Sequence, residues 1–291
     1  MKNVTVYEFN EKWRERDIAY ESLEDELKRR VYPLLCSLDR VTRPDKRMGR
    51  PPKVKPAMAA FLAVAKECGN ENTYRELASS RWVEFLGIKR VHYTTIHKAI
   101  KRLSPGLLED AGRMIAELVS GGKMDCVIDA TGMDIRKYEK EVYRGEERRK
   151  RQYLKLNGIW DAYRKVFHAV DVLEGKAHEY KGSQEMLERV RTPIGRFFGD
   201  PAYAGRDFVQ DVADSGAEPV IKPPKNATPK TKGGPAWRKL VMEYRELGYE
   251  DWRDKTGYGE RFPNEGQFGA FDTRFGDEAN VRSRHMVRGS D

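Results

Sequence analysis

The sequence predicts an α/β protein in which a mixed sheet flanked by helices follows an all-α N-terminal region. Two observations lead to this prediction. Before Gly121-Gly122 the apolar residues recur at helical spacing, whereas beyond it short β-branched and apolar runs alternate with helical segments. We therefore expect a helical domain over residues 1–122 and a sheet domain over residues 123–291, with the glycine pair at the boundary.

Composition indicates a basic protein without a membrane segment. The 291 residues include 55 Lys and Arg against 46 Asp and Glu, which gives a formal net charge of +9. Such a positive field attracts polyanions such as nucleic acid. No apolar run approaches the roughly 18 residues that span a bilayer, and Met1 to Tyr20 contains no apolar signal core. We therefore expect a cytoplasmic protein.

The three cysteines are predicted to be buried free thiols. Cys36, Cys68 and Cys126 lie far apart, without the spacing of metal ligands, which argues against a disulfide framework or a zinc site.

The N-terminal region is predicted to be a set of helices that binds DNA. Thr73-Tyr74-Arg75-Glu76 is a capping box at the start of a short helix. After a connecting segment, Thr94 or Thr95 is predicted to cap a second helix over 95–103, whose apolar face leaves Lys98, Lys101 and Arg102 elsewhere. A helix, a turn and a basic second helix form the arrangement of a helix-turn-helix, and a plain helical bundle is the alternative.

A basic, proline-rich connector over residues 43–56 precedes these helices. Its centre is Gly49-Arg50-Pro51, flanked by further basic residues. An extended cationic segment of this kind can lie in a DNA minor groove as an arm. A solvated linker that leads into the helix beginning near Pro56 is the alternative interpretation.

The second region alternates strands with helices. A hydrophilic run over 136–152, with Arg148 and Arg149 in a basic cluster, is predicted to be an exposed hairpin or loop, or a basic edge beside a phosphate backbone. The predicted strands are 125–131, 153–161, 165–173, 194–200 and 218–222, and the predicted helices are 183–190, 206–214 and 237–247.

Two of the predicted strands end in an isolated carboxylate, Asp129 and Asp200. An Asp at a strand end commonly serves a turn, because its carboxylate accepts hydrogen bonds from nearby backbone N–H groups. The same placement also holds an oxygen ligand rigidly for Mg²⁺. A metal site would need a third acid from the later helical region, and Glu265 is the candidate.

Glu265 follows Tyr258 and Arg261 at a spacing that a continuous helix would place on one face. Pro263 more readily begins a helix than continues one. The helix could therefore start just before Glu265 and leave Arg261 on its approach.

The contexts of these three acids resemble the acidic motifs of DDE transposases from bacterial and archaeal insertion sequences, of the IS-four and IS-five type. The resemblance covers Gly49 to about Arg284. It rests on Val127-Ile128-Asp129-Ala130-Thr131-Gly132, on Gly199-Asp200-Pro201-Ala202-Tyr203, and on Tyr258, Arg261 and Glu265 followed by Phe268 and Arg274-Phe275-Gly276.

This resemblance implies an RNase H-like catalytic domain behind a helical DNA-binding region, in a protein of archaeal source. Asp129, Asp200 and Glu265 would be the catalytic residues and the ligands of two Mg²⁺ ions, for which Mn²⁺ could substitute. The implied reaction is cleavage and strand transfer of double-stranded DNA by a nucleoid-associated homodimer, at terminal inverted repeats and at target DNA. The expected DNA contacts are Tyr258, Arg261, Arg274, Lys155, Arg148, Arg149, Arg50, Lys98, Lys101 and Arg102.

Two departures from the family pattern favour an alternative function. The family usually has a Lys seven residues after the glutamate, where this chain has Asp272, for which Arg274 could compensate. The chain also ends 26 residues after Glu265, so we expect a catalytic domain truncated at its C-terminus. The alternative is thus a catalytically inactive, truncated remnant that acts only as a DNA-binding protein. A third hypothesis is an RNase H-like nuclease that acts on RNA or replication intermediates.

Overall fold

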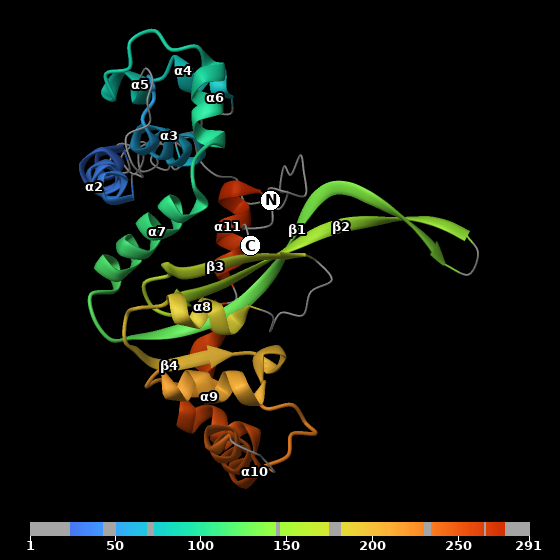
Figure 1. Cartoon of the computed structure of the whole chain (residues 1–291). Coiled ribbons are helices and arrows are strands. Elements are labelled where there is room, and N and C mark those ends of the chain that lie inside the picture. Colours follow the sequence, from blue (N-terminus) through green and yellow to red (C-terminus); the bar gives the residue numbers. More distant parts are fainter. Residues whose placement is uncertain are drawn as a thin grey trace, which may run out of the picture. The chain divides into compact units, whose positions relative to one another are not determined.

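The chain forms two compact units, Met1–Ala111 and Gly112–Asp291, which are described separately. The structure is a computed structural model (Figure 1). It describes residues 24–42, 51–68, 73–143, 146–174, 182–229, 234–264 and 266–276.

The described part of the first unit is helical around an aromatic core. Phe61 is fully buried, and its ring lies edge-on to Tyr32 at 5.3 Å and to Trp82 at 5.8 Å between centroids. Such aromatic contacts bury a large apolar area in a small unit. The helices are η1 (Leu27–Val31), α2 (Tyr32–Thr42), α3 (Pro56–Cys68), α4 (Tyr74–Ala78), α5 (Arg81–Phe85) and α6 (Tyr93–Lys101), and α7 (Pro105–Ser120) contains the division between the units.

The start of α4 confirms the predicted capping box. Glu76 N–H donates to Thr73 Oγ1 at 3.2 Å, and Thr73 N–H donates back to the Glu76 carboxylate at 2.9 Å. The threonine cap predicted for the basic helix is wrong. The backbone is extended at His92, whose ring nitrogen accepts from Thr94 N–H, so an imidazole takes the place of the expected hydroxyl. In addition, α5 fills the segment that was predicted to be a connector.

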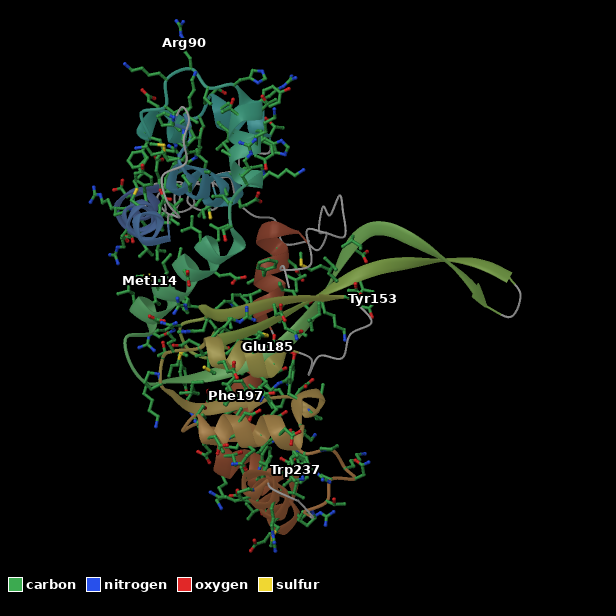
Figure 2. All side chains as sticks on the ribbon, in the orientation of Figure 1. Arg90, Met114, Tyr153, Glu185, Phe197 and Trp237 are labelled. Carbon is green, nitrogen blue, oxygen red and sulfur yellow. The ribbon has the colours of Figure 1, made fainter. Side chains whose placement is uncertain are left out.

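Figure 2 shows the side chain of Arg90 extending from the connector between α5 and α6. The side chain is exposed. The backbone φ of Arg90 is 41°, in the left-handed region, which residues other than glycine adopt at a cost in energy.

The second unit contains a five-stranded mixed sheet, which confirms the predicted α/β class. The strand order is β3-β2-β1-β4-β5; β1, β2 and β3 are antiparallel neighbours, whereas β4 runs parallel to both β1 and β5. The strands are β1 (Met124–Tyr143), β2 (Glu146–Asp161), β3 (Phe167–Glu174), β4 (Ile194–Gly199) and β5 (Glu218–Ile221).

Strands β1 and β2 are longer than the sequence predicts. Beyond their pairing with β3 and β4 they continue as a two-stranded ribbon, which projects from the sheet in Figure 1. The hydrophilic run over 136–152 forms most of this ribbon, so a hairpin replaces the alternative of a loop. In this ribbon the backbones of β1 and β2 pair although their side chains do not alternate between apolar and polar, which is the pattern that predicts a strand.

Helices cover both faces of the sheet. Side chains alternate along a strand, so the paired residues Cys126 and Phe197 project from one face, and the paired Val127 and Trp160 project from the other. Helix α9 (Arg206–Asp214), predicted with the same bounds, packs on the first face; α11 (Gly266–Phe275) packs on the second. The remaining helices are α8 (Ser183–Arg189), η2 (Pro201–Tyr203), α10 (Pro235–Thr256) and η3 (Tyr258–Asn264).

All three cysteines lie in the described residues, where they form no disulfide. Cys36, Cys68 and Cys126 are free, although only Cys126 is buried. No helix in the described ranges combines the length and the apolar character that a bilayer span requires.

Gly158 on β2 leaves room for an aromatic ring that supports α11. A Cβ atom at this position would lie 2.5 Å from Cε1 of Phe167. The ring of Phe167 packs against Trp160 and Phe268, at 5.5 Å and 6.0 Å between centroids. The absence of a side chain at Gly158 therefore lets the Phe167 ring of β3 lie against β2, where it packs on Phe268 of α11.

Replacing Gly158 with Ala should destabilise the second unit by about 1–3 kcal/mol, because the added methyl overlaps a ring that is itself held by packing. Urea unfolding measures the change. Gly132→Ala is the matched control on β1, since its Cβ would meet Tyr153 at an ordinary 3.7 Å. Equal stability of the two variants would contradict this description of the packing.

A buried polar network fixes the end of α7 to β2 and β3. Ser120 Oγ lies 3.0 Å from Asp161 Oδ2 and 2.9 Å from His168 Nε2. Hydrogen bonds from the N–H groups of Tyr163 and Arg164 keep the pKa of the Asp161 carboxyl below its usual range, against the opposing effect of burial. An ionised carboxylate only accepts, so the serine proton goes to Asp161 and His168 Nε2–H donates to Ser120.

The environment of the other ring nitrogen, Nδ1, disfavours protonation of His168. His168 Nδ1 is buried without a hydrogen-bond partner among the described residues. Burial lowers the pKa of His168 below its ordinary 6.5, although the charges of Asp161 and Glu117 oppose this shift. The unfolded state therefore binds a proton that the folded state does not, and stability falls as the pH drops below about 6.5.

His168→Gln should flatten the loss of stability below pH 6.5, because the amide can still donate to Ser120 but does not titrate. Urea midpoints measured between pH 7.5 and pH 5 test this. His97→Gln, at an exposed position on α6, is the control and should keep the wild-type slope. An unchanged slope in His168→Gln would overturn the assignment.

Candidate active site

Parallel pairing of β1 with β4 places two predicted acids side by side. The register pairs Val127 with Phe198 and Ile128 with Gly199. Asp129, within β1, and Asp200, directly after β4, come next, so they lie side by side where the pairing of the two strands ends, on the same face of the sheet. Neighbouring strands are about 4.8 Å apart, a spacing from which two carboxylates can share a cation.

The backbone orients both carboxylates. Asp129 Oδ1 accepts from the N–H of Ala130 at 2.9 Å, and Asp200 Oδ1 accepts from the N–H of Ala202 at 2.8 Å, which caps η2. The turn role expected of a strand-end Asp is therefore present at Asp200, whereas Asp129 lies within β1, where the chain does not turn. It is compatible with metal binding, because hydrogen bonds of this kind hold a ligand in a fixed orientation.

Arg261 on η3 brings a positive charge to the first carboxylate. Its Nη2 lies 3.6 Å from Asp129 Oδ2, and its side chain is only 11% exposed. The two groups form an ion pair at a separation too long for a hydrogen bond. Because a guanidinium stays charged, it offsets part of the repulsion between neighbouring carboxylates.

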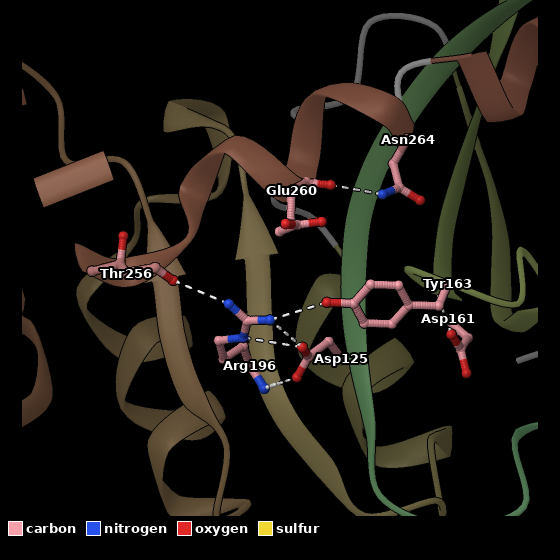
Figure 3. Close-up of polar contacts among 7 residues, drawn as sticks. All are labelled: Asp125, Asp161, Tyr163, Arg196, Thr256, Glu260 and Asn264. Atoms are coloured by element: carbon pink, nitrogen blue, oxygen red, sulfur yellow. Dashed lines mark hydrogen bonds and ion pairs between the residues drawn. The ribbon is translucent and has the colours of Figure 1, made fainter. Parts of the chain in front are cut away.

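A cluster around Arg196 holds the segment that carries Arg261 (Figure 3). The guanidinium of Arg196 donates two hydrogen bonds to Asp125 Oδ2, from Nη2 at 2.6 Å and from Nε at 3.0 Å. Nη2 also donates to the Tyr163 hydroxyl at 3.1 Å, and Nη1 donates to the carbonyl of Thr256 at 3.5 Å. The hydrogen bonds to Asp125 raise the pKa of Arg196. One cluster thus ties β1 and β4 to the end of α10.

Asn264 holds the other end of the same segment and is 2% exposed. Its Oδ1 accepts from Trp160 Nε1 at 2.9 Å and from Lys165 Nζ at 2.5 Å. Its Nδ2 donates to the carbonyl of Glu260 at 2.9 Å, which closes the turn within η3 (Figure 3). The segment from Thr256 to Asn264 is therefore fixed at both ends on the face that carries Asp129.

The third predicted acid, Glu265, lies outside the described residues. It follows the short helix η3, which contains Pro263, and α11 begins at the next residue. Tyr258 and Arg261 therefore lie on a short 3-10 helix that ends at Asn264, before α11 begins. Pro263 lies inside η3 rather than at a helix start.

The predicted DNA contacts in the second unit differ in their surroundings. Tyr258 is 3% exposed and packs on Trp252 at 5.1 Å, a position that favours support of η3 over contact with a ligand. Lys155 is half-buried on β2, opposite Gly132. Asp272, at the position of the family lysine, is half-buried on α11, and its Oδ1 is buried without a partner in the described ranges.

The other predicted DNA contacts are in the ribbon, in α11 and in the first unit. The side chains of Arg148, Arg149 and Arg274 lie outside the described part of the chain, as does Arg50 with the Gly-Arg-Pro arm. On α6 the structure exposes Lys98, Lys101 and, at its C-cap, Arg102.

The described donors fit a hard divalent cation, although they do not complete a site. Asp129 and Asp200 offer carboxylate oxygens, the ligand type that Mg²⁺ prefers. No group of three metal-binding side chains occurs among the described residues. Glu265, the third ligand predicted from the sequence, lies outside the described residues and directly follows Asn264.

Comparison with known families identifies this arrangement. Residues 120–267 match the family described as "Transposase DDE domain" over just over half of the 291 residues. The chain belongs to this family. The matched range of the transposase domain contains Asp129, Asp200 and Glu265. Membership indicates a transposase, an enzyme of a class that generally uses divalent metals. No curated protein matched the chain.

Four residues that organise the transposase domain are not among those predicted from the sequence: Asp125, Arg196, Trp160 and Asn264. The first pair is 71 residues apart in the chain, and the second pair is 104 apart. Local periodicity has no signal for such contacts. A signal was available for Asn264, because a polar residue beside a predicted ligand is a candidate support.

The contribution of Asp200 to stability, as the cap of η2, can be measured without metal present. With EDTA present, Asp200→Asn should stay within about 0.5 kcal/mol of the wild type, because the amide oxygen still accepts from Ala202. Asp200→Ala should lose about 0.5–2 kcal/mol through loss of the cap. Urea unfolding compares them, and equal stability of the two variants would show that this cap contributes nothing.

Proposed function

We propose that the protein catalyses metal-dependent DNA strand cleavage and strand transfer at the ends of an insertion sequence. The observation that carries this proposal is the parallel register that sets Asp129 beside Asp200 within a matched transposase DDE domain. The strand order β3-β2-β1-β4-β5, with three antiparallel strands followed by two parallel ones, supports an RNase H-like fold. The IS-four or IS-five type and the archaeal source belong to the same proposal.

Asp129, Asp200 and Glu265 are assigned as the ligands of two Mg²⁺ ions, for which Mn²⁺ can substitute. Bound ions of this kind activate the attacking oxygen and stabilise the leaving oxygen of a phosphodiester. The chain's own contribution is rigidity. Strands β1 and β4 fix the first two carboxylates, and backbone N–H groups hold one oxygen of each. Such fixed placement lowers the cost of aligning the reacting atoms.

Arg261 is proposed to bind the DNA phosphate next to the scissile bond. It carries a permanent charge beside Asp129, and its planar guanidinium matches phosphate geometry. Tyr258, buried at the start of η3, would support Arg261 through backbone placement. Lys155, Arg148, Arg149 and Arg274 are proposed to contact the duplex farther from the reacting atoms, where phosphate contacts position without reading sequence.

The first unit is proposed to bind DNA through α6 and the Gly-Arg-Pro arm. Lys98 and Lys101 are exposed on α6, and Arg102 is exposed at its end. A basic helix can enter the major groove, while Arg50 in an extended arm can enter the minor groove. The proposed domain bounds are 1–122 and 123–291, and the substrates are terminal inverted repeats and target DNA held by a homodimer.

Asp129→Asn should lower metal-dependent nicking and joining by about 10³-fold, because the variant loses a metal ligand worth several kcal/mol in the transition state. DNA binding should persist. The assay uses Mg²⁺ or Mn²⁺ and duplexes that carry the inverted repeats flanking the coding sequence.

Asp171→Asn on β3 is the matched control for this assay. Its Oδ1 also accepts from the N–H of the next residue, at 2.9 Å, so the substitution repeats the local change away from the site. Full activity of Asp129→Asn would refute the site assignment. Salt-sensitive DNA binding without cleavage by the wild type would favour the DNA-binding alternative.

A further inference from the structure

We propose that Arg261 is an exchangeable counter-ion of Asp129. In the metal-free protein it neutralises the carboxylate, and it turns to a DNA phosphate when a divalent cation binds. This inference rests on the proposed function, because it takes Asp129 as a metal ligand and Arg261 as a phosphate contact. It adds a link between the two roles: metal binding releases the group that then binds DNA, so metal and DNA should bind cooperatively.

The guanidinium and a metal ion would use the same carboxylate. Asp129 Oδ1 accepts from the N–H of Ala130 at 2.9 Å, which fixes the orientation of the group. Arg261 Nη2 lies 3.6 Å from the other oxygen, Oδ2. The two side chains are 11% and 21% exposed, so water and salt screen their charges only in part. A guanidinium at this separation repels a cation bound by Asp129, and the two positive groups therefore compete.

The contact between Arg261 and Asp129 differs from a structural ion pair in the same domain. Arg196 donates two hydrogen bonds to Asp125, at 2.6 Å and 3.0 Å. The 3.6 Å between Arg261 and Asp129 is too long for a hydrogen bond. Charge-assisted hydrogen bonds give such pairs much of their strength and their fixed geometry. Charge therefore dominates the contact of Arg261, and such a contact can be exchanged for one with another anion.

The backbone that carries Arg261 is fixed, so only its side chain has to move. Arg196 Nη1 donates to the carbonyl of Thr256, just before η3, and Asn264, the last residue of η3, accepts from Trp160 Nε1. Arginine side chains have much rotamer freedom, so the guanidinium can turn on a fixed backbone. It then stays within one side-chain length of its present place, where the proposed reaction brings a DNA phosphate.

The charges of the two aspartates favour this exchange. Asp129 and Asp200 lie on neighbouring strands, which run about 4.8 Å apart, and carboxylates this close repel each other. In the metal-free protein the charge of Arg261 reduces that repulsion. A divalent cation neutralises more of the carboxylate charge, so the attraction that holds Arg261 weakens. A DNA phosphate is then the stronger partner for its guanidinium.

The test measures Mn²⁺ binding to the full chain by electron paramagnetic resonance, without DNA. Arg261→Gln removes the charge and should lower the Kd for Mn²⁺ by about tenfold, because the metal no longer competes with a guanidinium. Arg261→Lys keeps the charge and should stay within about threefold of the wild type. An unchanged or higher Kd in Arg261→Gln would overturn the proposal, and so would an equal gain of affinity in Arg261→Lys.

Arg253→Gln is the matched control. Arg253 forms ion pairs with Glu250 at 2.8 Å and with Asp254 at 2.9 Å, all on α10, so the substitution removes the same charge from the same domain away from the two aspartates. Its Kd for Mn²⁺ should equal that of the wild type. A tenfold tightening in this control would assign the effect to net charge and overturn the exchange. Urea unfolding confirms that each variant is folded, and Arg261→Met decides the matter if Arg261→Gln does not fold.

The metal site and the exchange can fail separately. If Asp129→Asn binds Mn²⁺ as tightly as the wild type, the proposed metal site fails, and the exchange fails with it. If Asp129→Asn weakens Mn²⁺ binding and Arg261→Gln does not strengthen it, only the exchange fails.

The salt dependence of DNA binding tests where Arg261 goes. Binding to a short duplex without the inverted repeats is measured by fluorescence anisotropy at several salt concentrations, with and without Mn²⁺. Each phosphate contact adds about one to the slope of log K against log salt. The slopes of the wild type and of Arg261→Gln should be equal without Mn²⁺ and differ by about one with it. Equal slopes in both conditions, or the same difference already present without Mn²⁺, would overturn the exchange.

Discussion

The parallel pairing of β1 with β4 is the constraint on which the rest of the second unit depends. One register, Ile128 opposite Gly199, sets two carboxylates side by side where the β1–β4 pairing ends. Gly199 contributes by its size, since a Cβ there would lie 3.2 Å from Ile128 and 3.3 Å from Ile221. A one-residue slip in this pairing would turn Asp200 to the opposite face. The placement of these two candidate metal ligands therefore depends on backbone hydrogen bonds and on close packing between the strands.

A second constraint is the path of the chain across that face. The Arg196 cluster fixes the end of α10, and Asn264 fixes the end of η3. Between them Arg261 lies beside Asp129. Each anchor joins a charged or polar side chain to a sheet residue that is close in space and far away in sequence. The candidate site is thus assembled from three separate stretches of chain, and the buried polar contacts specify how they meet.

Much of this arrangement could be predicted from local sequence, and the limits have a physical cause. The apolar run before Asp200 predicts a strand that ends at this carboxylate, and β4 confirms it. The β-branched run before Asp129 also predicts a strand, but β1 continues to Tyr143, so Asp129 lies within the strand and not at its end. Helix α9 was predicted with its observed bounds because its periodicity is regular. The strand order, the β1–β4 register and the Trp160–Asn264 bond arise from residues far apart in the chain, so no local pattern contains them. The extended ribbon was underestimated because its strands lack an apolar face.

The measurement that tests the central claim most directly is a crystal structure of the protein grown with Mn²⁺, in which anomalous scattering locates the metal. We predict density bound by Asp129 and Asp200 where the β1–β4 pairing ends, with the carboxylate of Glu265 completing the site and Asn264 still bonded to Trp160. Metal bound elsewhere on the chain, or bound between the two aspartates with Glu265 turned away, would contradict it.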